Sequence, residues 1–594
     1  MDSDAARHYQ QRLQGYRLAL NRLERLHIAI GNAQIGLASS IIVAALLALA
    51  WKLFSVLWLL VPIVAMVTLG VVHERALRRR ARSGRVARFY EHVLDRVEDR
   101  WAGKGEAGDR FLDPEHPYAR DLDLFGQGSL FEYLSTARTR GGEATLARWL
   151  LSPSEPADLE TRHEAVRELA PDLDLREQLA VLGEDIRVGV NPEALAAWGE
   201  EPPRLASRGR WLVAGALSLL GVGTLAWWIF FGMAAPFVAV FVAARVFTYR
   251  IRGDIAHMIE AVEGPSHDLR LLSQVLVVLE RRDFSSRRLA ELRSALIVQG
   301  HPPSRRIARL YRLLELLDSR DNLALRVIDP VLLWTVHIVF AIETWRRTSG
   351  PHLRVWLDAV GEIEALLSLA GYSHEHPRDP FPEFVDRPLC FEAEQLGHPL
   401  IPEARCVRND LRLDGGLRVL VVSGSNMSGK STLLRAVGTN AVLAMAGAPV
   451  RATRLRISRL AVGASIRTLD SLQSGTSRFY AEITRLKQLV EMAGRDRPLL
   501  FLLDELLHGT NSHDRRIGAQ GLVRALAARP AIGLLTTHDL ALAQIADELA
   551  PLAVNMHFQD QIEEGRMRFD YRLRPGVVEH SNALDLMRSV GLDV

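Results

Sequence analysis

A glycine-rich segment between an apolar run and a helix-forming run constrains this chain more than any other feature. The run 417–422 predicts a short buried strand, and 432–437 predicts the first turns of a helix. Backbone N–H groups of such a loop surround phosphate oxygens, Lys430 reaches the β- and γ-phosphates, and the Ser431 hydroxyl joins the Mg²⁺ shell. We therefore predict an α/β domain that binds ATP with Mg²⁺. The segment matches G-x-x-x-x-G-K-[ST] and consists of Gly424, Ser425, Asn426, Met427, Ser428, Gly429, Lys430, Ser431 and Thr432.

Two further strands complete the expected catalytic edge. The apolar run 499–503 ends in Asp504 and Glu505, which predicts a buried parallel strand with both carboxylates at its C-terminal end. We expect Asp504 to hold Mg²⁺ through its water shell and Glu505 to polarise the attacking water. A second apolar run, 531–537, ends at His538, which can hydrogen-bond the water or the γ-phosphate. A loop histidine without a catalytic role is the alternative for His538, but its position directly after that strand favours catalysis.

Several motifs resemble one family. The stretches 474–482, 504–512 and 536–538, with Asn426-Met427 in the loop, look like the ATPase domain of MutS mismatch-repair proteins in order and spacing. The stretch 397–400 resembles the family's GRHP segment at the entry to that domain. The resemblance implies ATP hydrolysis with Mg²⁺. The chain departs from the family pattern, without removing a phosphate or metal ligand, at Ser425, Ser428, Arg478 and Asn511.

A second block extends the resemblance toward the N-terminus. Residues 128–142 and 147–153 are similar to the start of the MutS core domain, so the resemblance covers residues 120–200 and 350–594. MutS mismatch readers carry an N-terminal domain with a Phe-x-Glu wedge, followed by a connector domain. The residues that precede the core block here have a different composition, so we expect this chain to lack those two domains.

Long uncharged runs indicate membrane contact. Residues 28–51 and 53–72 contain no Asp, Glu, Lys or Arg, and each run is close to the length that spans a bilayer. A basic segment precedes them and a second run follows, so we expect no signal peptide. A further uncharged run, 211–244, is broken by Gly232 and Pro236 and predicts two tight spans or a shallow re-entrant hairpin. Buried core helices of a soluble protein are the alternative for both pairs.

Charge placement predicts the orientation of these hairpins. Residues 73–88 carry seven Arg against one Glu, and residues 1–27 carry five Arg. Positive residues remain on the cytoplasmic side, so we expect a multi-pass protein of the bacterial-type inner membrane, with both termini and the ATPase domain in the cytoplasm. The two cysteines, Cys390 and Cys406, fit a reducing compartment. The net charge of +3 says little about partners, because lipid head groups explain the arginines as well as nucleic acid does.

The resemblance also implies a dimer with a shared ATP site. In the MutS family a serine-bearing loop of one subunit approaches the γ-phosphate that the other subunit holds. That loop corresponds to 474–479 here, with Ser477 as the expected contact, and the turn 510–512 would cross the same interface. The alternative is a helix-capping loop whose serines bond only their own backbone.

The predicted fold is an α/β P-loop ATPase domain of MutS/ABC type, preceded by a mainly α-helical MutS-type core with transmembrane hairpins. Within the core we expect 322–345 to form one buried lever helix, despite its apolar character. The predicted parts are an N-terminal helix 1–27, hairpin 28–72, helical connector 73–119, core domain 120–210, hairpin 211–249, lever helices 250–371 and ATPase domain 372–594.

Two classes of function fit these features. The first is a membrane-anchored, dimeric MutS-like ATPase that binds DNA, with branched or unpaired structures favoured over single mispairs. The second is an ATP-driven switch at the lipid bilayer that acts on a protein or lipid partner without DNA. An ABC-type transporter fits less well, because 474–482 is not an LSGGQ motif and no transport domain is recognisable.

Overall fold

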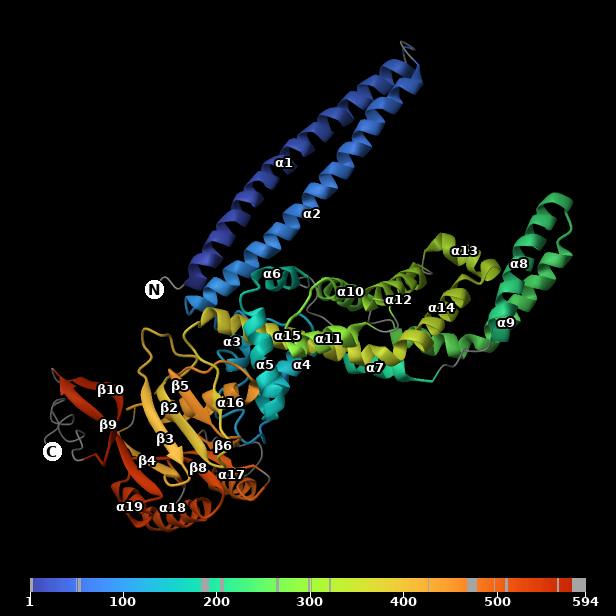
Figure 1. The fold of residues 1–594 in the computed structure, drawn as a ribbon. Coiled ribbons are helices and arrows are strands. Elements are labelled where there is room, and N and C mark those ends of the chain that lie inside the picture. Colours follow the sequence, from blue (N-terminus) through green and yellow to red (C-terminus); the bar gives the residue numbers. More distant parts are fainter. Residues whose placement is uncertain are drawn as a thin grey trace. The chain divides into compact units, whose positions relative to one another are not determined.

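The computed structural model describes residues 4–49, 51, 55–182, 192–202, 208–262, 266–297, 300, 302–319, 322–425, 427–466, 478–495, 497–507, 511–563 and 566–578. The chain forms two compact units (Figure 1). The first comprises Met1–Lys104 and Leu173–Asp185, and the second comprises Gly105–Asp172 and Ile186–Val594.

The first unit is a long helical hairpin with a short third helix at its base. Helix α1 (Asp4–Leu49) packs along α2 (Leu60–Val97), with η1 (Val56–Leu59) before α2, and α6 (Leu173–Val181) packs against α2. An apolar cluster that includes Tyr9, Leu13 and Tyr90 joins the helices at the base. At this end the Glu177 carboxylate accepts hydrogen bonds from Tyr16, at 2.5 Å, and from Tyr90, at 2.7 Å.

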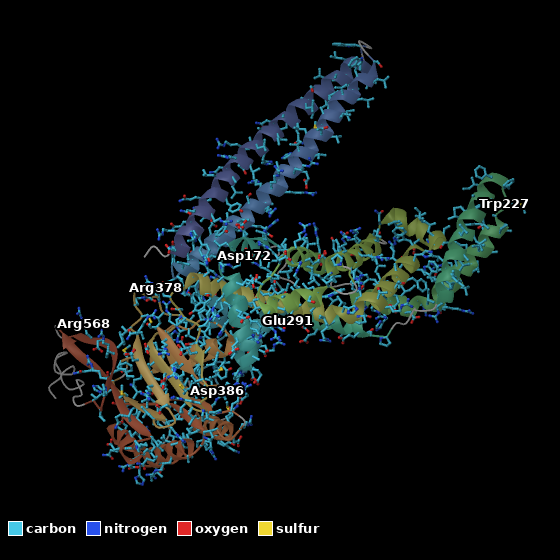
Figure 2. All side chains as sticks on the ribbon, in the orientation of Figure 1. Asp172, Trp227, Glu291, Arg378, Asp386 and Arg568 are labelled. Carbon is cyan, nitrogen blue, oxygen red and sulfur yellow. The ribbon has the colours of Figure 1, made fainter. Side chains whose placement is uncertain are left out.

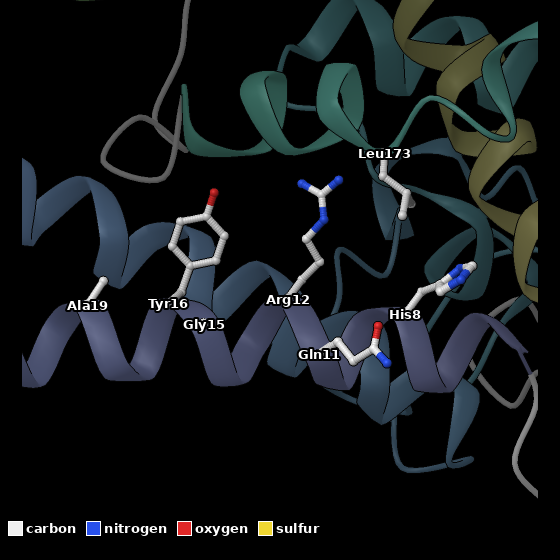
Figure 3. Close-up of a pocket in the computed structure, with 7 residues that line it drawn as sticks. All are labelled: His8, Gln11, Arg12, Gly15, Tyr16, Ala19 and Leu173. Carbon is white, nitrogen blue, oxygen red and sulfur yellow. The ribbon is translucent and has the colours of Figure 1, made fainter.

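A cavity of about 550 Å³ lies beside this base. Figure 3 shows Arg12 and Tyr16 of α1 pointing toward α6 across it. The Arg12 guanidinium donates a hydrogen bond to Asp174 Oδ1 at 2.8 Å. This contact joins α1 to α6 and raises the pKa of Arg12. Because acidic side chains of α6 already pair with Arg12 and Tyr16, this cavity is a packing feature of the hairpin base.

Three helices in the described part of the chain are long and apolar enough to cross a membrane, by length and composition. They are Asp4–Leu49, Leu57–Val97 and Gly209–Phe231. The first two correspond to the predicted hairpin 28–72, and the third is the first helix of the predicted hairpin 211–249. The partner of the third, α9 (Ala235–Val262), does not meet the same criteria, because charged residues begin at Arg245.

The helical part of the second unit is organised around α15 (Leu353–Glu375). The Glu364 carboxylate of α15 is buried and accepts hydrogen bonds from Thr139 Oγ1, at 2.5 Å, and from two backbone N–H groups that precede α4. The other helices are η2 (Asp109–Phe111), α3 (Leu130–Leu134), α4 (Arg140–Leu151), α5 (Pro156–Leu169), α7 (Pro192–Glu200), α8 (Arg208–Phe231), α10 (Ser266–Glu280), α11 (Arg287–Leu296), α12 (Pro303–Asp318), α13 (Leu323–Leu332), α14 (Trp334–Ser349) and η4 (Gly350–His352).

The predicted single helix 322–345 is wrong. The structure divides it into α13 and α14, which meet at an angle of 71°. Leu333 takes a left-handed backbone conformation between them, with φ of 49°. The Asp329 carboxylate accepts from Thr335 N at 2.8 Å, which satisfies an otherwise unpaired N–H at the start of α14. Pro330 removes a further helical hydrogen bond just before the break.

The C-terminal part of the second unit carries two sheets. The larger has six strands in the order β10-β9-β4-β8-β7-β6, parallel except for β10, and the smaller has the order β1-β5-β2-β3. Fully buried side chains such as Val421, Phe501 and Leu535 pack between the larger sheet and its helices. The elements are β1 (Glu383–Phe384), β2 (Cys390–Leu396), β3 (Asn409–Asp414), β4 (Val419–Ser423), α16 (Lys430–Ala446), β5 (Arg454–Ile457), β6 (Ala461–Ser465), α17 (Arg478–Met492), β7 (Leu499–Asp504), α18 (Ser512–Ala527), β8 (Ala531–Thr537), α19 (Leu540–Glu548), β9 (Ala553–Glu563) and β10 (Arg566–Pro575).

Candidate nucleotide-binding site

The glycine-rich loop lies at the C-terminal edge of the larger sheet, between β4 and α16. Gly424 and Gly429 have φ angles of 155° and 104°, which favour glycine. A Cβ atom on Gly424 would lie 2.7 Å from Ser428 Oγ, and one on Gly429 would lie 3.0 Å from the Tyr571 ring. The loop therefore needs glycine at both positions, for its backbone angles and for close packing.

Lys430 is the first residue of α16, and its side chain folds back over the loop. Its Nζ donates to the carbonyl oxygens of Gly424 and Ser425, both at 2.8 Å, and lies 3.7 Å from Glu505 Oε1. The side chain is buried. A cation held by weak carbonyl acceptors and one carboxylate is well placed to meet phosphate oxygens.

A hydroxyl and a carboxylate converge beside this lysine. Ser431 Oγ donates to Asp504 Oδ2 at 2.5 Å, and Thr536 Oγ1 donates to Asp504 Oδ1. Oxygen ligands of this kind suit Mg²⁺, which usually takes one or two carboxylates and completes its shell with water and substrate phosphates. No cluster of three His, Cys, Asp or Glu occurs among the described residues, and such a magnesium site needs none.

Glu505 and His538 face each other at the ends of β7 and β8. Glu505 Oε1 lies 3.3 Å from His538 Nδ1. The Glu505 backbone is held in a left-handed conformation, with φ of 47°, by its N–H bond to the carbonyl oxygen of Thr536 at 3.2 Å. The sheet order explains why Glu505 and His538 are close. Strand β8 lies between β4 and β7, so the C-terminal ends of these three strands lie side by side. This arrangement can orient a water and accept its proton.

The loop opens into a cavity of about 1180 Å³. Besides the polar residues, its lining includes apolar and aromatic side chains, which suit a nucleotide base. Burial, with Arg435 nearby, lowers the pKa of His398 to about 4, so this ring is neutral near pH 7. Among these wall residues only His398 lies in a predicted motif, the stretch 397–400, because the wall is formed by segments far apart in the chain: His398, Ile401, Phe558, Phe569 and Tyr571.

Two side chains of the predicted motifs 474–482 and 504–512 support the acidic turn through contacts that the motifs did not indicate. Glu482 of α17 is buried, and its Oε1 accepts from Leu507 N at 2.6 Å, which supports the turn after Glu505. The Asn511 side chain accepts from Asp514 N at 2.9 Å and caps α18. The three-residue spacing of Asn511 and Asp514 was the available signal for the cap.

The structure brings most of the predicted site residues together. The hydroxyl-bearing Ser428 is buried in the loop, whereas Met427 is exposed at its surface. Asn426 and Ser477 lie outside the described residues, as do 508–510 of the acidic motif. The predicted residues that line the cavity are Met427, Gly429, Lys430, Ser431, Thr432, Asp504 and Glu505.

Comparisons with known proteins find similarity to MutS proteins. The family model described as MutS domain V matches residues 420–593. The chain is 34% identical over 244 residues to "Endonuclease MutS2" of Thermus thermophilus, covering 40% of this chain and 30% of the relative. It is 32% identical over 277 residues to "DNA mismatch repair protein MutS" of Exiguobacterium sp., covering 45% of this chain and 31% of the relative. These alignments therefore span under a third of each relative.

Proposed function

We propose that this chain, whose C-terminal part matches the model of MutS domain V, is a membrane-anchored, Mg²⁺-dependent ATPase that works as a dimeric conformational switch. The observation that carries the proposal is the convergence of Lys430, the Ser431–Asp504 pair and Glu505 at one sheet edge. Together they supply a cation for phosphate charge, oxygen ligands for a hard metal ion and a carboxylate for water.

The residues have separate roles in the proposed hydrolysis. Lys430 holds the β- and γ-phosphates, and Ser431 and Asp504 would hold Mg²⁺, which neutralises charge on the phosphoryl group when bound. Glu505, oriented by His538, accepts a proton from the attacking water. The water oxygen bonds to the γ-phosphorus as the bond to the bridging oxygen breaks, and ADP and inorganic phosphate leave.

Substitution of the proposed base tests hydrolysis. We expect Glu505→Gln to lower ATP turnover by at least about 10²-fold, the typical contribution of a general base, while ATP stays bound. Lys430→Ala should weaken ATP binding itself. The exposed Glu491→Gln on α17 is the matched control, because it makes the same chemical change away from the cavity. Wild-type turnover by Glu505→Gln would refute the assignment.

We further propose that the switch acts on DNA, with branched or unpaired structures as substrates. Support comes from the names of the two relatives, an endonuclease and a DNA mismatch repair protein. The test is binding of the detergent-solubilised full chain to mispaired, branched and single-stranded DNA, with and without ATP. Nucleotide-dependent binding to any of these supports the proposal. Equal absence of binding to all of them favours the alternative, a protein or lipid partner.

A further inference from the structure

A short apolar helix in the lever region is more exposed than a core helix should be. Helix α13 has the sequence LALRVIDPVL and lies between α12 and α14. Val327 is 73% exposed and Ile328 is 43% exposed, and the neighbouring Arg326 is also exposed. A buried lever helix would cover these side chains, so α13 presents an apolar edge with a cation at its side.

The inner side of α13 is attached to the apolar helix α8. The Ser218 hydroxyl of α8 lies 2.9 Å from the carbonyl oxygen of Leu332 and 2.9 Å from His337 Nε2 of α14. Gly221 allows a close approach, because a Cβ atom there would lie 3.1 Å from the carbonyl oxygen of Val331. Small residues and hydroxyl groups at a helix contact are typical of membrane helices. Whatever medium surrounds α8 is therefore also close to α13 (Figure 1).

The outer faces of α8 carry large apolar side chains. Trp211 and Phe230 are exposed, and the ring centre of Trp227, labelled in Figure 2, lies 4.4 Å from that of Phe231 near the turn into α9. The apolar edge of α13 thus belongs to a helix that packs on α8, which is long and apolar enough to cross a membrane.

The length of α13 excludes a full span. Its 10 residues cover about 15 Å, half of a hydrocarbon core of roughly 30 Å. The chain then turns by 71° into α14. The turn is anchored on the lever side, where Trp334 Nε1 donates to the carbonyl oxygen of Leu316 in α12 at 3.2 Å. Such a helix can enter a bilayer only part of the way and must leave on the same side.

We propose that α13 is a re-entrant arm that contacts the lipid bilayer, with Val327 and Ile328 against acyl chains and Arg326 at the head groups. The inference rests on the proposed membrane attachment through α8. Its consequence is a second lipid contact on the lever helices themselves. Helices α14 and α15 follow α13 in the chain, and α15 packs on α4 and α5. The helices α13 to α15 would therefore contact the bilayer at one end and the helices α4 and α5 at the other.

Depth-dependent quenching tests the proposal on the full chain. A single cysteine is placed at Val327, Phe230 or Ile517, in a chain whose Cys390 and Cys406 are replaced by serine, and is labelled with an environment-sensitive fluorophore. The labelled proteins are reconstituted into vesicles that contain spin-labelled lipids. Phe230→Cys on α8 reports membrane attachment, and Ile517→Cys is the matched control, because Ile517 is an exposed apolar residue on α18 of the ATPase domain. ATP binding by each labelled protein confirms that it is folded.

The expected result is quenching of the Val327→Cys probe comparable with that of Phe230→Cys, and none for Ile517→Cys. Quenching at Phe230 with an unquenched probe at Val327 would overturn the proposal and leave membrane attachment intact. A Val327 probe that is shielded from water yet not quenched would also overturn it, because a protein surface then covers α13. Absence of quenching at both positions would overturn the membrane attachment and this inference together.

Discussion

At the residue scale, the charged form is penalised most in ionisable side chains that are buried away from water without a partner of opposite charge. His163 of α5 is buried between the rings of Phe381 and Phe384, and among the described residues its Nε2 makes no hydrogen bond. Burial, helped by the positive charges of Arg167 and Arg162, lowers the pKa of His163 to about 4. The neutral ring is therefore the form that the folded protein accommodates.

This shift predicts a pH-dependent stability. The unfolded chain binds a proton at His163 below about 6.5, whereas the folded chain does so only below about 4. Stability therefore falls as pH drops from about 6.5 to about 4, by up to about 3 kcal/mol from this residue. We expect His163→Phe to reduce the loss of melting temperature over this interval, measured by thermal unfolding in detergent. An unchanged pH profile would contradict the assignment.

At the scale of elements, α4 and α15 come close enough for their backbones to touch at a pair of glycines. A Cβ atom on Gly361 of α15 would lie 2.8 Å from the carbonyl oxygen of Gly141 in α4. The closeness lets the chain just before α4 place its N–H groups on the buried Glu364 carboxylate. Burial raises the pKa of Glu364, so these hydrogen bonds stabilise a group that would otherwise resist ionisation.

Gly361→Ala should therefore separate the two helices. We expect a loss of about 1–3 kcal/mol, the usual cost of overpacking, seen as a lower melting temperature. Gly521→Ala on α18 is the matched control, because a Cβ atom there meets nothing within 4 Å. That control should stabilise the helix by roughly 0.5–1 kcal/mol. Equal effects of the two substitutions would show that the close contact does not matter.

At the scale of the whole molecule, the proposed switch requires a second copy of the chain. A γ-phosphate at a sheet edge attracts donors from a partner, and hydrolysis removes that attraction, so nucleotide state becomes association state. Mixing a Lys430→Ala subunit with a Ser477→Arg subunit, each inactive alone, should restore partial ATPase activity, because one composite site stays intact. Absence of recovery, with an ATP-bound Glu505→Gln protein that remains monomeric, would refute the shared site.

Membrane anchorage also belongs to this scale. Deletion of residues 28–72 should strongly reduce retention of the chain in the inner-membrane fraction, because it removes most of the exposed apolar surface of the first unit. A reporter fused to the C-terminus should be active in the cytoplasm only. Activity of that reporter in the periplasm would contradict the orientation that the arginine clusters predict.

Features that depend on neighbours along the chain could be predicted from the sequence. The loop that ends in Lys430, the acidic end of β7, the α/β character of the C-terminal domain and the apolar helices follow from short motifs and local periodicity. The resemblance of the C-terminal domain to MutS is confirmed by the match of MutS domain V to residues 420–593, and the resemblance of 120–200 stays a prediction. Membrane insertion and the shared ATP site stay predictions.

Contacts between distant segments could be seen only in the folded chain. The order that places β8 between β4 and β7 sets Glu505 beside His538, and the approach of β10 places Tyr571 against Gly429. The break at Leu333 attaches α13 to α8 instead of extending one lever helix. These contacts join residues far apart in the chain, so they leave no local pattern. They arise when whole elements bury their apolar faces against one another, which no single segment specifies.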